Sequence, residues 1–221
     1  MTPLIIAIDG PAGSGKSTLA RRLAIEFGLP YLNTGLMYRA ITRLALERGV
    51  DPGDGVHLAD LVGGISFSVA EEGNPPSLHI DGMPPLEDLM SDEVEAAVSG
   101  VSRHGPVRER LREEQRRLGA KGAVVEGRDI GSVVFPDASV KIFLKAEEEE
   151  RASRRVQERQ SAGVRDPGEE IAESLRSRDE QDSRVNPFVP APDAVVLDTT
   201  DRDQTQVFDE AAETVRNRLA K

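Results

Sequence analysis

The chain has 221 residues, of which 38% are hydrophobic and 30% are charged, as is typical of a globular domain with an ordinary core. It contains no cysteine, which excludes disulfides and thiolate metal sites, and no apolar run approaches the roughly 20 residues that span a bilayer. The net charge of −11 argues against nucleic acid or an anionic membrane as the main partner, but not against a small phosphate-bearing ligand. We therefore expect a single cytoplasmic domain over residues 1–221.

Five short apolar runs predict strands that are covered on both faces. They lie at residues 4–8, 31–32, 123–125, 140–144 and 195–197. Between them, apolar residues recur with helical spacing. These residues are Leu19, Leu23, Ala24 and Phe27; Leu36, Ala40, Ile41, Leu44 and Ala45; Ile171 and Leu175; and Val207, Phe208, Ala211, Val215 and Leu219. Strands that alternate with helices predict an α/β fold with a parallel sheet of about five strands flanked by helices.

One stretch departs from this alternation. Residues 65–69 and 77–80 alternate apolar and polar side chains, and turn-forming residues lie between them at 72–76. This pattern is typical of two half-exposed antiparallel strands. Ser91 then stands where it would cap a helix that carries Val94, Ala97, Val98 and Val101. We predict a small antiparallel β insertion and its helix at about 62–104.

The strongest local motif follows the first predicted strand and opens the first predicted helix. Residues 10–17 read Gly-Pro-Ala-Gly-Ser-Gly-Lys-Ser and fit the P-loop pattern G-x-x-x-x-G-K-[ST], with Thr18 next. In a P-loop the glycines let backbone N–H groups surround phosphate oxygens at a helix N-terminus. We expect a nucleoside triphosphate to bind at Gly10, Pro11, Ala12, Gly13, Ser14, Gly15, Lys16, Ser17 and Thr18, with Lys16 on the β/γ-phosphates and Ser17 on Mg²⁺.

Three further segments place arginines beside glycines and carboxylates. Residues 31–39 and 126–131 each follow a predicted strand, and residues 178–184 read Arg-Asp-Glu-Gln-Asp-Ser-Arg. Because ligands of open parallel sheets bind beyond the carboxyl ends of the strands, the first two segments point to the crevice of the P-loop. Guanidinium groups that converge there would bind phosphate. A fourth segment, at 147–165, is highly charged and nearly free of apolar residues, which is typical of a solvated helix face.

Over nearly its full length the chain resembles the bacterial cytidylate kinases, a family of P-loop nucleoside monophosphate kinases. The resemblance rests on residues 6–11, 34–39, 126–138 and 193–200 in addition to the P-loop. It implies transfer of the γ-phosphoryl group of ATP to CMP and dCMP with Mg²⁺, by a monomer. It also implies an enlarged acceptor-binding insertion with a small β-sheet and a helical lid at about 147–166.

The resemblance also implies the role of each site residue. Lys16, Arg128, Arg178 and Arg155 would stabilise charge during transfer, with Arg155 one of several lid arginines beside Arg151, Arg154 and Arg159. The acceptor would be held by Thr34, Tyr38, Arg39, Ser99, Arg108, Arg128, Asp129, Arg178, Asp182 and Arg184. Two positions depart from the family pattern: Asn33 replaces an aspartate, and Arg184 falls one residue early in Arg-Asp-x-x-Asp-Ser-x-Arg.

Two alternatives follow from the residues themselves. A P-loop alone is shared by kinases, switch proteins and motors, so a nucleotide-dependent switch is one alternative, although the Asn-Lys-x-Asp motif that reads guanine is missing. Another P-loop kinase with UMP, AMP or a small alcohol as acceptor is the other. A switch would turn over slowly, whereas a kinase would consume ATP when its acceptor is present.

Overall fold

The computed structural model describes residues 3–161, 168–185 and 189–220. The strands in these ranges are β1 (Ile5–Asp9), β2 (Tyr31–Asn33), β3 (Phe67–Gly73), β4 (Pro76–Ile80), β5 (Ala123–Gly127), β6 (Val140–Lys145) and β7 (Val195–Asp198). They form one sheet in the order β3-β4-β2-β5-β1-β6-β7. From β2 to β7 the neighbouring strands are parallel, which confirms the predicted parallel sheet of five strands.

The predicted insertion contributes two further strands to the same sheet. β3 and β4 are antiparallel, as expected, and β4 then runs parallel to β2 through the pair Tyr31 and Ser77. The first strand begins later than the predicted residue 65 and extends to Gly73. The hairpin is therefore an extension of the main sheet at its β2 edge.

Eight α-helices lie in the described ranges. They are α1 (Lys16–Phe27), α2 (Thr34–Arg48), α3 (Gly55–Val62), α4 (Asp92–Ser102), α5 (Gly105–Gly119), α6 (Glu148–Ser161), α7 (Gly168–Val185) and α8 (Gln204–Leu219). A 3-10 helix, η1 (Glu87–Met90), precedes α4, and a π-helical turn, η2 (Ile130–Val134), follows β5. As expected, the Ser91 side chain caps α4, by accepting a hydrogen bond from the Val94 N–H. The sequence analysis did not predict α3 and α5.

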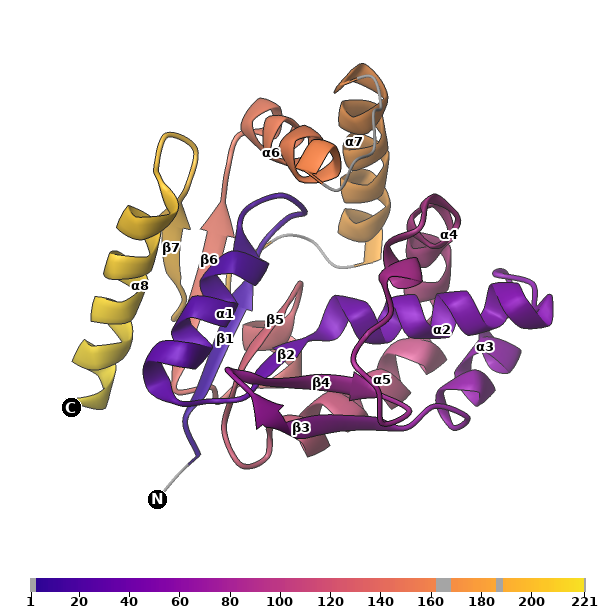
Figure 1. Cartoon of the computed structure of the whole chain (residues 1–221), viewed down its shortest axis with the longest axis horizontal. Coiled ribbons are helices and arrows are strands. Elements are labelled where there is room, and N and C mark those ends of the chain that lie inside the picture. Colours follow the sequence, from indigo (N-terminus) through magenta and orange to yellow (C-terminus); the bar gives the residue numbers. More distant parts are fainter. Residues whose placement is uncertain (1–2, 162–167, 186–188, 221) are drawn as a thin grey trace.

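Each face of the parallel sheet has its own apolar layer. On one face, α1 and α8 pack their buried stripes against β1, β5 and β6. On the other face, η2 packs against β1, β2 and β5. A third core joins α2, α3 and α5 to the β3–β4 hairpin. Figure 1 shows α2, α3 and α5 grouped with the β3–β4 hairpin, at the end of the sheet opposite β7 and α8.

The carboxyl ends of the parallel strands lie at one edge of the sheet, and α6 and α7 form a pair above that edge (Figure 1). Three segments follow the ends of β1, β2 and β5 at this edge: the P-loop, the first turn of α2 and the segment that contains Arg128. This is the edge at which ligands of open parallel sheets bind. Within the described ranges, every helix is too short or too polar to cross a membrane.

Candidate active site

The P-loop has a backbone that only glycine adopts readily at three positions. Gly10, Gly13 and Gly15 have φ values of 148°, 74° and 90°. A Cβ at Gly10 would lie 2.3 Å from the carbonyl oxygen of Leu144 on β6, so a larger residue cannot be accommodated there without a backbone shift. Because α1 begins at Lys16, the loop lies at a helix N-terminus, where the helix dipole favours an anion.

Two polar groups of the loop are arranged for a ligand. The Lys16 Nζ lies over the loop and donates to the Pro11 carbonyl oxygen at 2.6 Å. The Ser14 Oγ is buried and has no hydrogen-bond partner among the described residues. A buried hydroxyl without a partner is costly, and a phosphate oxygen in the loop would provide one.

Glu126 brings a buried carboxylate to the P-loop from the end of β5. Its Oε2 accepts a hydrogen bond from the Ser17 hydroxyl at 3.0 Å, and its Oε1 accepts one from the Tyr31 hydroxyl. Burial raises the pKa of Glu126, and the charge of Lys16 opposes this effect. Burial, followed by the Glu126 charge, raises the pKa of Tyr31 well above its ordinary value. A hydroxyl and a carboxylate beside a phosphate loop are oxygen donors of the kind that Mg²⁺ prefers.

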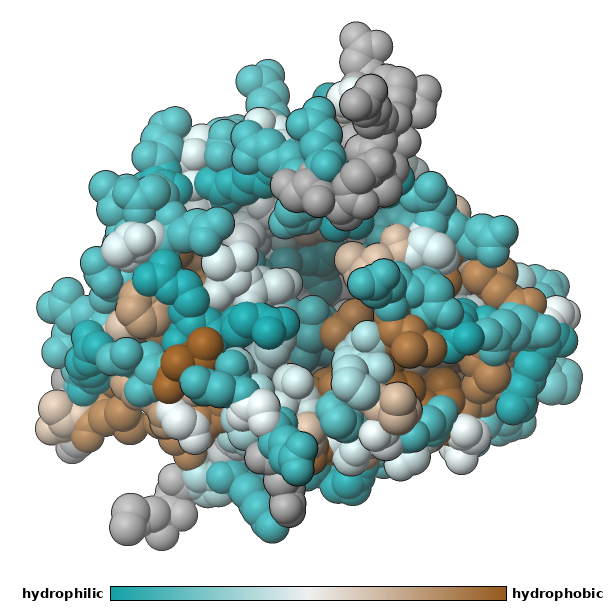
Figure 2. Space-filling model, viewed as in Figure 1, coloured by the Kyte–Doolittle hydropathy of each residue, from teal (hydrophilic) through white to brown (hydrophobic). Residues whose placement is uncertain are grey.

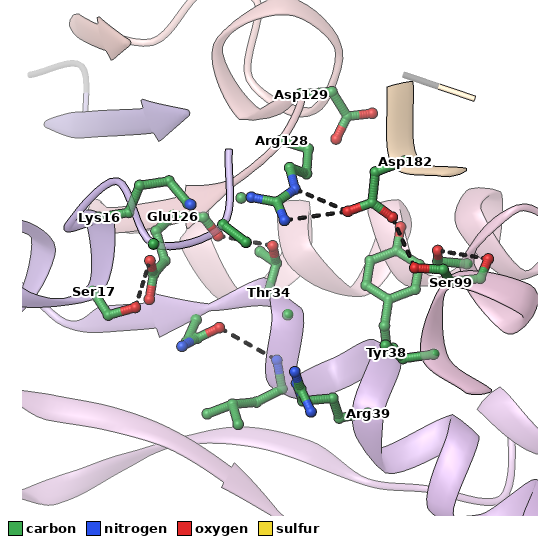
Figure 3. A pocket seen from close by; sticks show the side chains of 18 of the residues that line it. Lys16, Ser17, Thr34, Tyr38, Arg39, Ser99, Glu126, Arg128, Asp129 and Asp182 are labelled. Atoms are coloured by element: carbon green, nitrogen blue, oxygen red, sulfur yellow. Dashed lines mark hydrogen bonds and ion pairs between the residues drawn. The ribbon is translucent and has the colours of Figure 1, made fainter. Parts of the chain in front are cut away.

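Arg128 lies between the P-loop residue Lys16 and Asp182 (Figure 3). Its NH1 donates to the Gly10 carbonyl oxygen at 2.6 Å, and its Nε and NH2 each lie 3.2 Å from Asp182 Oδ2. The other carboxylate oxygen of Asp182 accepts a hydrogen bond from the Ser99 hydroxyl at 3.1 Å. Residues from the segment after β5, from α7 and from α4 are thus joined in one polar network.

A second carboxylate gathers two arginines of α5. Asp129 Oδ2 accepts hydrogen bonds from Arg108 at 2.8 Å and from Arg112 at 2.6 Å. Tyr38 of α2 lies beside this group, and burial raises its pKa to about 12. Gln115, whose side chain is buried, lines the same part of the cavity. Such a set of fixed donors and acceptors can read the polar edge of a nucleobase.

The start of α2 supplies two further predicted residues. Thr34 is buried and donates through its hydroxyl to the Glu126 carbonyl oxygen at 2.8 Å. Arg39 is buried too, and its guanidinium donates to the Leu89 carbonyl oxygen at 3.0 Å and pairs with Glu95 of α4. Arg39 therefore has a fixed position at the wall of the cavity.

The four arginines of α6 have different partners, and Arg155 is the one of the four that lines the cavity. Arg151 is buried and donates to the P-loop carbonyl of Ala12 at 3.1 Å. Arg154 donates to the Thr199 hydroxyl at 3.0 Å, and its NH1 lies 4.0 Å from the position of a Cβ on Gly15. The other two face α4. They are Arg155, which lies near Glu95, and Arg159, which pairs with Asp92.

Asp9, at the end of β1, holds the segment that contains Arg128 and Asp129. Its two carboxylate oxygens accept the backbone N–H groups of Ile130 and Gly131, each at 2.8 Å. Burial is the main cause that raises the pKa of Asp9 to about 6, and the two backbone hydrogen bonds oppose it. The start of the P-loop and the start of η2 are therefore fixed to each other.

The P-loop and these side chains lie around one cavity of about 240 Å³, slightly below the range of roughly 300–1,000 Å³ that is usual for small-molecule sites. Figure 2, in the same view as Figure 1, shows a hollow in the surface below α6. The predicted residues that line the cavity are Ala12, Gly13, Gly15, Lys16, Ser17, Thr18, Thr34, Tyr38, Arg39, Ser99, Arg108, Arg128, Asp129, Arg155 and Asp182. Gly10, Pro11 and Ser14 form the part of the loop behind this lining. The P-loop and the predicted acceptor residues thus share one space.

Two further predicted residues are not among the described residues that line the cavity. Arg184 is exposed near the end of α7 and is not among the residues that line the cavity. The side chain of Arg178 lies outside the described part of the chain, although its backbone belongs to α7.

Sequence reasoning assigned no role to several residues of the site. Glu126 had a usable signal, because it is an acidic residue at the end of a strand beside a P-loop. Gln115 and Arg112 had none, since α5 itself was not predicted. Glu95 lies on a predicted helix close to the acidic residues Asp92 and Glu93, and residue type alone does not distinguish it from them.

The sequence is similar to those of known proteins over nearly its whole length. The family model for cytidylate kinase matches residues 6–217. The cytidylate kinase of Acidiphilium cryptum is 45% identical, covering 99% of this chain and 98% of that protein. The cytidylate kinase of Mycolicibacterium paratuberculosis is 43% identical over 97% and 96%, and that of Paramagnetospirillum magneticum is 46% identical over 92% and 93%. The chain belongs to the cytidylate kinase family.

Proposed function

We propose that this protein transfers the γ-phosphoryl group of ATP to CMP and dCMP, giving ADP and the nucleoside diphosphate. The observation that carries the proposal is the position of Arg128, which contacts the P-loop at Gly10 and the acceptor side at Asp182. A group in this position can contact the phosphoryl group while it moves from donor to acceptor. Membership of the cytidylate kinase family supports the same assignment.

The donor would bind with its phosphates in the P-loop. Its β- and γ-phosphate oxygens would replace the Pro11 carbonyl as the partner of Lys16 and would satisfy the buried Ser14 hydroxyl. Ser17 and Glu126 would hold Mg²⁺, which adds positive charge beside the phosphate oxygens when it is bound. The hydroxyl and carboxylate oxygens of these two residues, 3.0 Å apart, fit a cation that takes oxygen ligands.

The acceptor would bind with its base between α2, α4 and α5. The amide-like edge of cytosine would meet Arg108, Asp129 and Ser99, while Asp182 would accept hydrogen bonds from the ribose hydroxyls. Arg39 and Arg128 would contact the acceptor phosphate. These roles follow from the position of each side chain on the cavity wall and from the family resemblance.

The transfer itself would need alignment and charge stabilisation. The acceptor phosphate oxygen is already anionic near neutral pH, so no general base is needed to activate it. Lys16, Arg128 and the lid arginine Arg155 would stabilise the charge on the transferring group, with Arg178 as a further candidate on α7. The lid, which contains α6, would exclude water, which otherwise competes as the acceptor.

The remaining assignments are proposals of the same kind. We propose one kinase domain with the acceptor insertion at about 62–104 and the lid at about 147–166. We further propose that the protein acts in the cytoplasm as a monomer and binds nucleotides, not nucleic acid.

The proposal is tested by measuring ADP release from Mg-ATP with CMP, dCMP, UMP, AMP and GMP as separate acceptors, against a blank without acceptor. We expect rapid release with CMP and dCMP only. Turnover with another acceptor would retain the kinase but contradict the cytosine assignment. Release that does not depend on any acceptor would instead favour a nucleotide-dependent switch.

A further inference from the structure

Glu95 of α4 contacts two arginines that come from different sides of the cavity. Arg39, from α2, pairs with Glu95 Oε2, and the NH2 of Arg155, from α6, lies 3.5 Å from the same oxygen. The side chains of Arg39, Glu95 and Arg155 are 6%, 13% and 19% exposed. One largely buried carboxylate oxygen is therefore shared by a residue of the acceptor pocket and a residue of the lid.

Glu95 acts on these arginines from behind the cavity wall. Arg39 and Arg155 both line the cavity, whereas Glu95 is not among the lining residues. Arg39 is held from a second direction by the Leu89 carbonyl oxygen. The carboxylate can therefore keep both guanidinium groups in place and still leave the space in front of them to a ligand.

The charges explain why this contact matters for the lid. Two guanidinium groups near one another repel, and the repulsion is stronger where water is largely excluded. With Glu95 between them, Arg155 can approach Arg39 while α6 lies over the P-loop. Arg155 also pairs with Glu158 of its own helix at 3.2 Å, but the Glu158 side chain is 62% exposed, so water screens that pair. Without the largely buried Glu95 carboxylate, the position of Arg155 near Arg39 would be less favourable until another anion arrived.

We propose that Glu95 is a positioning residue that couples Arg39 on the acceptor side to Arg155 on the lid. The inference rests on the proposed kinase function. Through this contact, the lid closes when Arg39 is in its position in the acceptor pocket. The γ-phosphoryl group is then transferred to an acceptor phosphate and not to water. Glu95 itself touches neither the substrate nor the reacting atoms.

A second contact between α6 and α4 offers a comparison. Arg159 NH2 lies 2.8 Å from Asp92 Oδ1, but the Asp92 side chain is 78% exposed. Exposed ion pairs contribute little to stability, and among the described ion pairs Asp92 contacts Arg159 and not Arg39. Asp92→Asn therefore removes a tether of the lid while leaving the link between Arg39 and Arg155. Glu93 is an exposed residue of the same helix, and the described ion pairs between α4 and α6 involve Glu95 and Asp92 instead. Glu93→Gln therefore removes a charge from α4 without removing a contact to the lid.

The experiment compares Glu95→Gln with Asp92→Asn and Glu93→Gln in the ADP-release assay, with saturating Mg-ATP and with or without CMP. For Glu95→Gln we expect kcat with CMP to fall about tenfold, and the ratio of CMP-dependent to CMP-independent ADP release to fall at least about tenfold. The two control variants should keep both values within about twofold of wild type. A Glu95→Gln enzyme with an unchanged ratio would overturn the inference.

A double-mutant cycle separates coupling from a general loss of stability. Because Glu95 is proposed to act through Arg155, Glu95→Gln combined with Arg155→Met should lose no more than about twofold beyond the more damaging single variant. Independent, multiplicative losses would overturn the inference, as would a lowered Tm with unchanged kinetics. If Glu95→Gln does not fold, Glu95→Asp keeps the charge but withdraws it by one methylene, and it should lower the same ratio by several-fold.

The wild-type protein in the same assay distinguishes the two proposals. If wild type phosphorylates CMP and Glu95→Gln behaves like it, only the role of Glu95 is contradicted. If wild type releases no ADP in response to CMP, the proposed function fails and the inference fails with it.

Discussion

The guanidinium of Arg128 contacts the Asp182 carboxylate through two nitrogens, with Nε and NH2 each 3.2 Å from Asp182 Oδ2. Its third nitrogen donates to the Gly10 carbonyl oxygen of the P-loop. Arg128 thus connects α7, which packs against the lid helix α6, to the loop that would hold the donor phosphates. One side chain is in contact with the parts that would bind each substrate.

The first prediction concerns Arg128. Arg128→Lys keeps the positive charge but loses the planar fork that reaches Asp182 and Gly10 together. We expect kcat with CMP to fall about a hundredfold, as is typical when a donor that stabilises transition-state charge is lost. Steady-state ADP release at saturating ATP and CMP measures the effect.

Arg116→Lys provides the control. Arg116 donates to the backbone carbonyls of Val133 and Val134, and it does not line the cavity. Its kcat should stay close to that of wild type. An Arg128→Lys enzyme within about threefold of wild type would contradict the role of Arg128.

The second prediction concerns selection of the base. Arg108 of α5 pairs with Asp129 at 2.8 Å and lines the cavity. Arg108→Met leaves Asp129 with Arg112 alone, so the fixed donor that would face cytosine is lost. The preference for CMP over UMP in kcat/KM should fall about tenfold or more.

Arg110→Met is the matched control on the same helix. Arg110 pairs with Asp60 and donates to the Ala59 carbonyl oxygen, and it does not line the cavity. Its variant should retain the wild-type preference. Equal preferences in the Arg108 and Arg110 variants would remove Arg108 from base recognition.

The third prediction concerns Glu126. Glu126→Gln keeps the shape of the side chain but removes the carboxylate that accepts the Ser17 hydroxyl at 3.0 Å. We expect the Mg²⁺ concentration for half-maximal ADP release to rise about tenfold, because loss of a group that orients a metal ligand commonly costs 10- to 100-fold in affinity.

A titration of Mg²⁺ at fixed ATP and CMP checks this prediction, with the exposed Glu149→Gln as control. The control should titrate like wild type. An unchanged Mg²⁺ requirement in Glu126→Gln, together with lower stability, would make Glu126 a structural residue of β5 only.

The parts of the fold that the sequence predicts correctly are those encoded over short distances. The strand, the P-loop and α1 follow one another directly, so local periodicity and the positions of Gly10 and Lys16 suffice. In contrast, α5 was missed because its buried apolar residues, such as Val107 and Leu111, are few among many charged ones. Pro106 in its first turn was the local signal available.

The parts of the site that could not be predicted depend on contacts between distant segments. The pairing of β4 with β2 at Tyr31 and Ser77, which joins the hairpin to the main sheet, has no local pattern. Glu95 likewise lies 60 residues from Arg155, and nothing in the periodicity of α4 separates it from the exposed Glu93. The assignment of Arg184 to the acceptor site stays a prediction, because its motif has a shortened spacing and its side chain is exposed near the end of α7.

The last prediction concerns pH and Asp9. The Asp9 carboxyl has a pKa of about 6 in the folded protein, mainly because it is buried, against 3.8 for the ordinary group. Between these two values the folded state binds more protons than the unfolded state, so this group's contribution to stability falls as the pH rises. Measured against Asp9→Asn, the free energy of unfolding of wild type should fall by roughly 2–3 kcal/mol from about pH 4 to about pH 7.

Urea denaturation at a series of pH values measures this difference, and Asp137→Asn, which removes an exposed carboxylate, should follow the wild-type pH profile. Asp9 accepts two backbone hydrogen bonds from Ile130 and Gly131, and these favour its charged form. If they outweighed burial, the pKa would lie below 3.8 and the difference from Asp9→Asn would change in the opposite direction as the pH falls. The sign of the pH dependence therefore shows which effect dominates at Asp9. If burial dominates, ionisation of the Asp9 carboxyl lowers the free energy of unfolding; if the two backbone hydrogen bonds dominate, ionisation raises it.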